Sequence, residues 1–426
     1  MAMQRSSFAF ARPSRRDLLR AATALPLVST AALLRAAEPD LSALSPITGA
    51  ARPIDAVERA ARLVRAQALM KANGIAAVIC EPGSSLLYFT GVRWSRSERP
   101  TLAILPAEGE ACVVTPFFEE PSVRQTLAIP ASVRVWQEDE NPFAVAAGFL
   151  RDSRLDHGTI GIEETVRYFI QHGLARALPD ATIVPGNAVV RGVRMIKTAA
   201  EIALMQAATD VTVAAYRWTH GRVETGMTGA EIGALMTAAT AKLGGEPEFS
   251  MALIGAAAAL PHGSREVVRL ARGDVLLMDC GCAVQGYQSD VSRTWIHGVA
   301  SREQRRVWDH VAEGQRIAFA AARIGAPAGS IDDAVRRRYT ALGYGPGYRL
   351  PGLSHRTGHG IGMDGHEPVN LVHGEATPLA AGMCFSNEPG IYLPGKFGVR
   401  LEDCSHMTAT GPRWFSEPPK SIDVPV

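Results

Sequence analysis

The 426-residue chain carries 44 Lys and Arg against 42 Asp and Glu, and 47% of its residues are hydrophobic. This composition describes a globular protein with a sizeable core, and the length favours two domains over one. The formal net charge of +2, without a basic block, argues against a nucleic-acid-binding protein. The six cysteines lack the spacing of a metal knuckle or a disulfide framework, so we expect small buried side chains rather than ligands.

The first residues have the layout of an export signal. Arg15 and Arg16 precede a mainly apolar, alanine-rich run. A charged segment followed by an apolar one is typical of a secretory signal, and the arginine pair of a twin-arginine signal. Pro26 interrupts the run, which is too short for a stable membrane span of ~20 apolar residues. We expect residues 1–37 to be removed on export to the periplasm or the exterior of a bacterium, and residues 38–54 to be a linker.

Residues 55–190 alternate between helical and strand patterns, which predicts an α/β first domain. Apolar residues at helical spacing begin after Asp55 and end at Asn73-Gly74, a typical helix C-terminus. Ile75 to Cys80 is then predicted to be a buried strand, and further short apolar runs predict more strands. No cluster of candidate ligands occurs here. The segment from Gly91 to Arg96, with one tryptophan and two arginines, is either a substrate contact or a solvated loop.

Four matches to the capping-box pattern predict helix starts in a second domain, residues 195–426. They begin at Thr198, Thr228, Ser301 and Ser330. Apolar strand patterns follow each pair of helices, so the domain divides into two similar halves of two helices and a sheet. Two such halves can pack around a shared cleft to which each contributes carboxylates. The predicted fold class is therefore α/β (α+β), with an α/β domain followed by a pseudo-symmetric catalytic domain.

Four carboxylates lie in or beside the predicted strands of the second domain. Asp279 follows four apolar residues, and an acid carried into the core needs a partner or a metal. Asp290 lies on the next strand, where a hairpin through Gly286 would bring it face to face with Asp279. In the other half, Glu388 ends one strand and Glu402 lies inside the next. Any one of these acids alone would more often be a surface or ion-paired residue.

A glycine-rich stretch, residues 355–366, contains three histidines. Imidazoles ligate metals or move protons near neutral pH, and glycines allow close backbone approach. The alternative is a polar surface loop that carries histidines by chance. With His359, the four carboxylates make an oxygen-rich set of five ligands that suits two ions of Mn(II), Co(II), Fe(II) or Zn(II). Two such metals, about 3.5–4 Å apart, can share a hydroxide and polarise a carbonyl.

This ligand set and histidine stretch resemble the pita-bread metallopeptidases: aminopeptidase P, prolidase, methionine aminopeptidase and their metal-free relative creatinase. The resemblance covers residues from about 55 to 426, and its first domain is of the type that aminopeptidase P, prolidase and creatinase share. It implies that Asp279 chelates one metal, that Asp290 and Glu402 bridge both, and that His359 and Glu388 complete the second. Creatinase lacks these ligands, and this chain has all five.

The same resemblance implies catalytic roles for further residues. His262, His355, His366 and Arg400 match family residues near the site. A hydroxide bridging the metals would attack the carbonyl before proline, with Glu388 as the general base. His355 and His366 would stabilise the oxyanion or contact the substrate, and His262 would orient the substrate or help protonate the leaving nitrogen. For His262, a plain Pro-His-Gly turn is the alternative.

We therefore predict a dinuclear-metal hydrolase, an Xaa-Pro aminopeptidase or dipeptidase, that acts on small peptides with proline at the second position. Mn(II) is the first candidate metal, and the resemblance implies a homodimer or homotetramer. One alternative is a non-peptidase relative that acts on a small zwitterionic compound, such as a dimethylsulfoniopropionate lyase or an ectoine-derivative hydrolase. Another is a non-enzymatic binding protein, which the complete ligand set disfavours.

Overall fold

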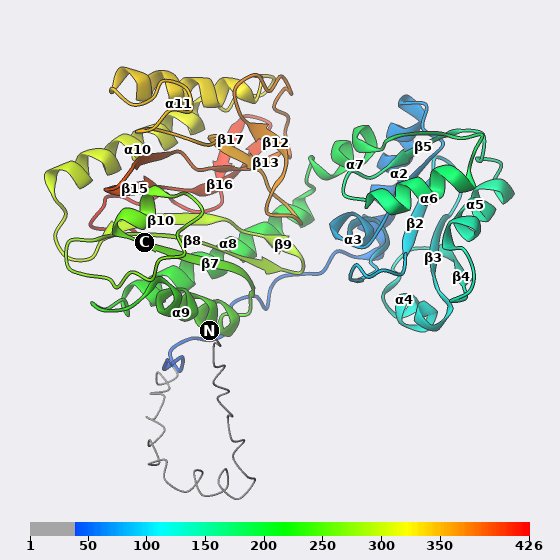
Figure 1. Ribbon diagram of the computed structural model, residues 1–426, viewed down its shortest axis with the longest axis horizontal. Helices are drawn as coiled ribbons and strands as arrows, with labels where there is room; N and C mark the ends of the chain where they lie inside the picture. Colours follow the sequence, from blue (N-terminus) through cyan, green and yellow to red (C-terminus); the bar gives the residue numbers. More distant parts are fainter. Residues whose placement is uncertain (1–38) are drawn as a thin grey trace, which may run out of the picture. The chain divides into compact units, whose positions relative to one another are not determined.

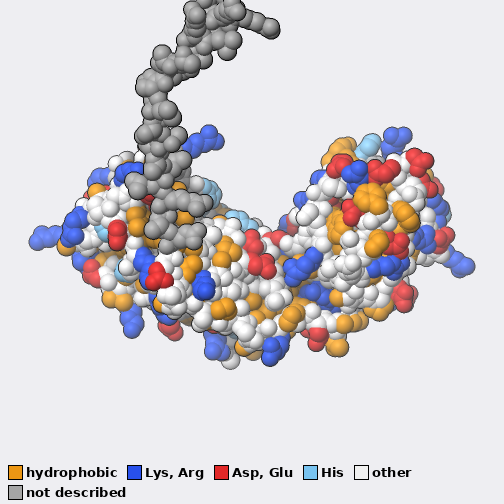
Figure 2. Space-filling view, turned by 90° about the horizontal axis from the view of Figure 1, so that it is seen from below, with side chains coloured by type: hydrophobic (Ala, Val, Ile, Leu, Met, Phe, Trp, Pro, Cys, Tyr) orange, Lys and Arg blue, Asp and Glu red, His pale blue; other side chains and the backbone are white. Residues whose placement is uncertain are grey.

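The computed structural model describes residues 39–426, of which residues 41–426 form one compact unit (Figure 1). The predicted export signal, residues 1–37, lies outside the described residues. Within them, no helix combines the length and the apolar character that crossing a bilayer requires. Acidic and basic side chains are interspersed over the face shown in Figure 2, as the near-neutral net charge leads one to expect.

The first part of the unit is built on a six-stranded mixed sheet with the order β4-β3-β2-β1-β5-β6. Its strands are β1 (Ala77–Cys80), β2 (Leu102–Pro106), β3 (Ala111–Pro116), β4 (Ala131–Trp136), β5 (Thr159–Ile162) and β6 (Thr182–Pro185). The helices are α2 (Ala56–Ala72), α3 (Ser84–Thr90), α4 (Glu120–Thr126), α5 (Pro142–Asp152), α6 (Tyr168–Ala177) and α7 (Asn187–Arg194). Every residue of β1, β2 and β3 is buried, as expected for a sheet covered on both faces. The predicted α/β layering is present.

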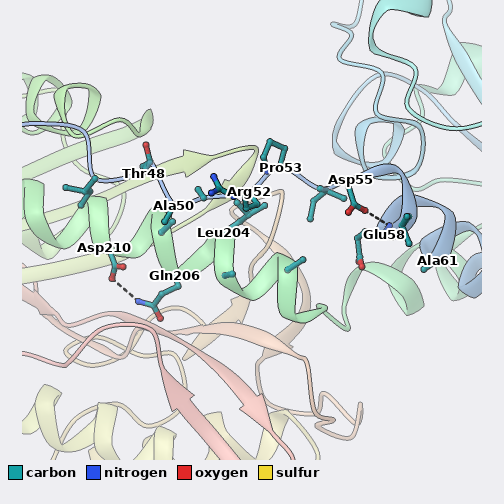
Figure 3. Close-up of a pocket in the computed structure, with 17 residues that line it drawn as sticks. Thr48, Ala50, Arg52, Pro53, Asp55, Glu58, Ala61, Leu204, Gln206 and Asp210 are labelled. Carbon is teal, nitrogen blue, oxygen red and sulfur yellow. Dashed lines mark hydrogen bonds between the residues drawn. The ribbon is translucent and has the colours of Figure 1, made fainter.

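The predicted first helix is confirmed as α2. Asp55 is its N-cap, and the side chain accepts a 2.8 Å hydrogen bond from the backbone N–H of Glu58. The helix ends at Asn73, and Gly74 follows with φ of 65°, a left-handed conformation that favours glycine. Ahead of α2, the segment from Ile47 to Asp55 runs beside helix α8 (Ala199–His220) and lines a cavity of about 700 Å³ with it (Figure 3).

The second part contains two helix pairs, a four-stranded and a five-stranded sheet, and the two-stranded β14-β15 hairpin. Its first half comprises α8 (Ala199–His220), α9 (Gly229–Lys242), β7 (Glu246–Ile254), β8 (Val275–Val284), β9 (Tyr287–Gln288) and β10 (Val291–Ile296). Its second half comprises α10 (Arg302–Ala321), α11 (Gly329–Ala341), β11 (Gly358–Gly360), β12 (Glu367–Leu371), β13 (Cys384–Asn387), β14 (Gly390–Leu393), β15 (Phe397–Arg400), β16 (Asp403–Thr408) and β17 (Gly411–Trp414). Figure 1 shows α8 and α9 on one side of the strands and α10 and α11 on the other. The predicted repeat of helices followed by a sheet is confirmed.

Three of the four predicted capping boxes are complete, at Thr198, Thr228 and Ser301. In each, the N-cap side chain accepts a hydrogen bond from the backbone three residues later, and the side chain there accepts one from the N-cap backbone. The fourth is wrong. Helix α11 begins one residue before Ser330, whose hydroxyl donates to the carbonyl of Pro327 at 2.6 Å instead. The acid predicted to complete this box, Asp333, lies 2.7 Å from a ring nitrogen of His373. A local contact therefore takes the serine of the predicted box, and a long-range contact takes the acid.

The strand prediction around Glu402 also needs correction. The chain leaves the β14-β15 hairpin after Arg400 and enters the five-stranded sheet at Asp403. Glu402 lies in this crossing, outside both strands, and its backbone N–H donates to the carbonyl of Ser292 on β10 at 3.1 Å. The crossing therefore joins the two halves of the second part.

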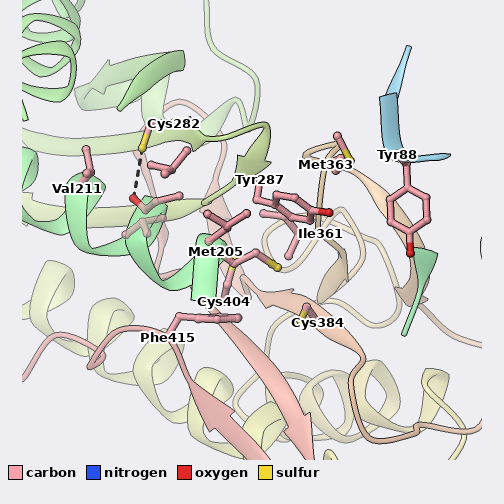
Figure 4. Packing of buried hydrophobic residues seen from close by; sticks show 14 of the residues in the cluster. Tyr88, Met205, Val211, Cys282, Tyr287, Ile361, Met363, Cys384, Cys404 and Phe415 are labelled. Atoms are coloured by element: carbon pink, nitrogen blue, oxygen red, sulfur yellow. Dashed lines mark hydrogen bonds between the residues drawn. The ribbon is translucent and has the colours of Figure 1, made fainter. Parts of the chain in front are cut away.

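A hydrophobic cluster underlies the strands that carry the acids (Figure 4). All six cysteines are buried and unpaired, as predicted. Burial raises the pKa of Cys384 to about 12, so this side chain stays a neutral thiol. Cys280 and Cys404, the neighbours of two acids, are buried in the same cluster, and burial raises their thiol pKa values also. These cysteines therefore act as small apolar side chains.

Candidate metal centre

The first pair of acids stands at one end of the β8-β10 pair. In the antiparallel register, Asp279 on β8 lies opposite Ser292 on β10. Asp290, two residues before Ser292, therefore points to the same face of the sheet. The hairpin brings Asp279 and Asp290 together side by side rather than in direct opposition.

The second pair of acids has the equivalent place in the other half. Strands β13 and β16 pair with Asn387 opposite Asp403. Glu388 follows the first strand and Glu402 precedes the second, so both acids stand at the same end of this pair. The backbone here is fixed by a buried ion pair between Arg293 and Asp403, whose atoms lie 2.7 Å apart, and Arg293 also donates to the carbonyl of Glu402 at 2.8 Å.

A single cavity of about 320 Å³ brings all the predicted site residues together. The residues that line it are Pro261, His262, Asp279, Asp290, His355, Arg356, His359, His366, Glu388, Arg400 and Glu402. Nine of these eleven were singled out in the sequence. Pro261 was noted only as part of a turn, and Arg356 was not assigned to the site.

Three groups of these side chains have ligand atoms within 4.8 Å of one another. The groups are Asp279 with Asp290 and Glu402, His359 with Glu388 and Glu402, and Asp290 with His359 and His366. Asp290, His359 and Glu402 each belong to two groups. The third group also includes His366, which the sequence suggested as a catalytic residue rather than a ligand.

The buried acids fit divalent cations in charge and in donor type. One oxygen of Asp290 and one of Glu402 are buried without a hydrogen-bond partner. Burial and the neighbouring carboxylates raise the pKa of both groups well above the usual range. Burial likewise raises the pKa of Glu388 to about 7. Uncompensated buried carboxylates are costly, and divalent ions supply the missing charge and use these oxygens as ligands.

Arg400 and Ser292 hold Asp279 and Glu402 in place through hydrogen bonds. The Arg400 guanidinium donates to Asp279 at 2.7 Å and to the Ser292 hydroxyl at 2.9 Å. That hydroxyl lies 2.8 Å from an oxygen of Asp279 and 2.8 Å from an oxygen of Glu402. Because a hydroxyl has one proton, it donates to one carboxylate at a time. Ser292 was missed in the sequence, although it lies two residues after Asp290 on the predicted strand, a spacing that places both side chains on one face. In the structure Asp290 lies between β9 and β10, just outside both strands, which corrects its predicted place within a strand.

His359 presents one ring nitrogen to the acids. Its Nδ1 lies 3.1 Å from the carbonyl of Gly360, so that nitrogen carries the proton. The other nitrogen, Nε2, lies 3.5 Å from Glu388 and 3.7 Å from Asp290. Burial, and then the neighbouring His366, lower the pKa of His359 well below its usual value. The imidazole is therefore neutral, with a lone pair directed at the acids, which is the form that binds metal.

Close backbone packing fixes the position of His359 on β11. A Cβ atom at Gly358 would lie 2.1 Å from the carbonyl oxygen of Ser386, and one at Gly360 would lie 2.2 Å from that of Pro368. No side chain fits at either position. The two glycines therefore let β11 lie between its neighbours and set the depth of the histidine between them.

Both ring nitrogens of His355 have hydrogen-bond partners. Its Nδ1 lies 2.7 Å from the carbonyl of Arg356, and its Nε2 lies 2.7 Å from the hydroxyl of Tyr392. Burial, followed by the charge of Arg400, lowers its pKa to about 3, so the ring is neutral. It therefore donates to the backbone and accepts from Tyr392, which also accepts from Arg400 at 3.2 Å. Tyr392 was not predicted from the sequence.

His366, Arg356 and His262 form the more exposed side of the cavity. The Nδ1 of His366 lies 3.2 Å from the Arg356 guanidinium, which also donates to the Asn370 side chain at 2.8 Å. Burial and the Arg356 charge lower the pKa of His366. The rings of His366 and His359 pack with centroids 4.0 Å apart. The side chain of His262 has no hydrogen-bond partner among residues 39–426, so its ring is available to a substrate.

A buried ion cluster anchors the histidine loop. Glu367 accepts from Lys197 at 3.0 Å and from Arg194, and it also accepts from the backbone N–H of Met363 and Asp364. Burial alone would raise the pKa of Glu367, but these two cations and the backbone donors bring it to about 2. Arg194 and Lys197 lie more than 160 residues before Glu367, so no local pattern reveals this anchor.

The segment from Gly91 to Arg96 does not line the cavity. Arg96 donates to the carbonyls of Pro82 and Thr165, each at 2.9 Å, and Trp94 packs partly buried against the hydrophobic cluster. These contacts within the described chain favour the second interpretation of the segment, a loop, over a substrate contact.

Comparisons with known proteins relate both parts of the chain to characterised families. Residues 203–409 match the model of metallopeptidase family M24, and residues 62–196 match that of the creatinase/prolidase N-terminal domain. A probable dipeptidase PepE of Mycobacterium tuberculosis is 32% identical over 368 residues, which cover 84% of this chain and 95% of the relative. An Xaa-Pro dipeptidase of Lactobacillus helveticus is 29% identical, with 84% and 97% covered.

Solved structures give the same relationship. The crystal structure of dipeptidase PepE from Mycobacterium ulcerans has a TM-score of 0.79 and 31% identity, and the match covers 87% of this chain and 98% of that one. The expected pita-bread architecture with a creatinase-like first domain is thereby confirmed.

The acid cluster predicts that the metal-free protein loses stability as pH rises. The pKa of Glu388 is raised from 4.5 to about 7, so the folded state holds this proton more tightly than the unfolded state. The associated stability is fully present below the unfolded pKa and disappears as pH rises through about 7. We expect the Tm of chelator-treated protein to fall between about pH 5 and about pH 8, and Mn(II) to reverse the fall. Glu388→Gln should flatten the metal-free profile; a wild-type profile already flat in chelator contradicts the prediction.

The geometry also separates the two neighbouring histidines. His359→Ala should lose metal and activity together, because its Nε2 faces two acids. His366→Ala should keep metal near the wild-type content while kcat falls by on the order of 10²–10³, as for a lost oxyanion donor. Metal analysis and kinetics of both variants test this difference. Loss of metal in His366→Ala would instead favour the third ligand group, in which His366 is a ligand.

Proposed function

This chain belongs to metallopeptidase family M24 and is a metallopeptidase, and on that premise we propose that it hydrolyses the peptide bond before proline, as an Xaa-Pro dipeptidase or aminopeptidase. The observation that supports this most is the single cavity shared by the five candidate ligands and four further candidate site residues. The relatives named dipeptidase PepE and Xaa-Pro dipeptidase support a peptide substrate.

We propose that two divalent ions bind here, with Mn(II) as the first candidate. Asp279 would hold one ion, and His359 and Glu388 the other. Asp290 and Glu402 would serve both: together with Asp279 they form one ligand group, and each shares a further group with His359. When bound, divalent ions polarise a carbonyl and lower the pKa of water.

The protein's own residues then have distinct tasks. Glu388 faces both His359 and His355, at 3.5 and 3.8 Å, and we assign to it the acceptance of the water proton. His366 has one ring nitrogen without a partner among the described residues, and His262 has two. Both can therefore donate to the developing oxyanion or to the leaving nitrogen. His355 has no free nitrogen, so it positions Tyr392 and Arg400 rather than the substrate.

A peptide assay tests the function. Metal-loaded protein should release proline-containing products from Ala-Pro or Ala-Pro-Ala, and should leave Ala-Ala largely uncleaved. Asp279→Asn should abolish the activity because it removes a ligand, whereas Asp210→Asn, an exposed acid on α8 outside the cavity, should not change it. Activity on dimethylsulfoniopropionate or an ectoine derivative without any on these peptides would move the chain to the non-peptidase alternative.

We also propose that the chain is exported by a twin-arginine signal in residues 1–37. The proposal is supported by the Arg15-Arg16 pair and the apolar run that follows. Replacing both arginines by lysine keeps the charge but removes the pattern, and should retain the full-length protein inside a bacterial host. Fractionation of cells that express both forms measures this, and equal export of both would contradict it.

A further inference from the structure

His366 lies outside the strands that fix its neighbour in the site. Strand β11 ends at Gly360 and β12 begins at Glu367, so residues 361–366 form the connection that carries this histidine, and we call them the histidine loop. By contrast, His359 lies within β11, where close backbone packing fixes it. The orientation of His366 therefore depends on what holds the histidine loop.

The histidine loop folds around the carboxylate of Glu367. The backbone N–H groups of Met363 and Asp364 donate to one of its oxygens at 3.0 and 3.1 Å. Lys197 donates to the other oxygen at 3.0 Å. Gly362 packs against both groups, since an added Cβ would lie 2.8 Å from the Lys197 side chain and 2.9 Å from each oxygen of Glu367. The conformation of the loop therefore depends on where this carboxylate is held.

The first part of the molecule bonds to this loop through helices α7 and α3. The Arg194 guanidinium on α7 donates to Asp364 at 2.8 Å and also to Glu367. The hydroxyl of Ser84 on α3 donates to the second oxygen of Asp364. Arg194 also donates to the hydroxyl of Ser85 at 3.0 Å, which joins the two helices at this point. Both acids that shape the end of the loop are therefore bonded to the first part.

Gln288 on β9, in the second part, holds the start of the loop. Its backbone N–H donates to the carbonyl of Gly362 at 2.8 Å, and its side-chain amide donates to that of Met363 at 3.1 Å. The side chain of the next residue, Asp364, is bonded to the first part instead. The second part therefore fixes the start of the loop, and the first part fixes the portion next to His366.

The first part acts on the site from outside the metal cavity. The described residues that line that cavity all lie between Pro261 and Glu402, in the second part. The side chain of Arg194 lines an adjoining cavity of about 350 Å³ together with Asp364 and His366. Arg194 can therefore influence the chemistry only through the residues that it holds.

We propose that Arg194 is a positioning residue through which the first part of the molecule holds His366 in the orientation that the reaction requires. The proposal rests on the proposed function, in which His366 donates to the oxyanion or to the leaving nitrogen. It gives the first part a task in catalysis, although no described residue of that part lines the metal cavity. Loss of Arg194 should displace His366 and leave the candidate ligand His359 in place, because the packing of β11 does not involve Arg194.

Kinetics of Arg194→Met, His366→Ala and the double variant test this role. Arg194→Met should keep metal near the wild-type content and KM nearly unchanged. Its kcat on Ala-Pro should fall by about 10–100-fold, since a misplacement of ~1 Å costs on the order of 10²-fold. The double variant should be no slower than His366→Ala alone, because Arg194 acts through that imidazole. Arg194→Lys should recover part of the rate, because it returns the charge without the planar fork.

Hydrogen exchange measures the same contact without turnover. In metal-free protein, the backbone amides of residues 361–366 should exchange faster in Arg194→Met than in wild type, while those of β8 should be unchanged. Ser84→Ala removes a single hydroxyl from this contact and should give a smaller increase in the same amides. If Arg194→Met does not fold, Ser84→Ala and Arg194→Lys decide by the same measurements.

Arg191→Met is the matched control. Arg191 also lies on α7, and its guanidinium pairs with Glu164 rather than with the loop. This variant should leave kcat and the exchange of the loop unchanged.

Three results would overturn the proposal. They are equal exchange of the loop in Arg194→Met and wild type, loss of metal in Arg194→Met, and a further fall in kcat when Arg194→Met is added to His366→Ala. Failure of the wild type to cleave any Xaa-Pro compound would instead refute the proposed function. The exchange comparison would then still decide whether the first part holds the histidine loop.

Discussion

Mutual repulsion among buried acids is the constraint on which the second part of the molecule depends. Asp279, Asp290, Glu388 and Glu402 arrive on four chain segments, two from each half. Ligand groups containing these acids have their atoms within 4.8 Å of one another. Such a cluster is unfavourable in any fold without cations. The two sheets and the crossing at Glu402 supply the rigid frame that keeps the acids together, and Arg400 supplies part of the missing charge. The negative charge that Arg400 leaves uncompensated is the charge that divalent cations would neutralise.

Much of this frame was predictable because it follows from local patterns. Apolar runs revealed the strands, and the capping boxes at Thr198, Thr228 and Ser301 revealed three helix starts. The acidic ligands were found because acids in or beside apolar strand patterns are unusual, although only Asp279 lies inside a strand of the structure. The fourth box failed because Ser330 turns to the nearby carbonyl of Pro327 and Asp333 turns to His373, 40 residues along the chain. Sequence spacing carries no record of the distant contact.

The residues that sequence reasoning missed act through long-range contacts. Arg194 and Lys197 reach Glu367 across the chain, and Tyr392 meets His355 and Arg400 only after folding. Their types are common and their neighbours in sequence unremarkable, so no pattern marks them. The same holds for charge balance, which is a property of the folded cavity. Ligand types can therefore be predicted from sequence, whereas the residues that position and neutralise them emerge from tertiary structure.

The packing of strand β11 decides where this site can vary. Backbone carbonyls fill the space beside Gly358 and Gly360, within 2.2 Å of any added Cβ, so no mutational path leads away from glycine there without displacing a neighbouring strand. His359 is therefore locked to the scaffold by its neighbours as well as by its own chemistry. Arg356 and His262 line the more exposed side of the same cavity, and the hydrogen bonds of the Arg356 guanidinium go to the side chains of Asn370 and His366 rather than to backbone. Related chains can accordingly differ in substrate choice at these two positions while the strand that carries the candidate metal ligand His359 stays the same.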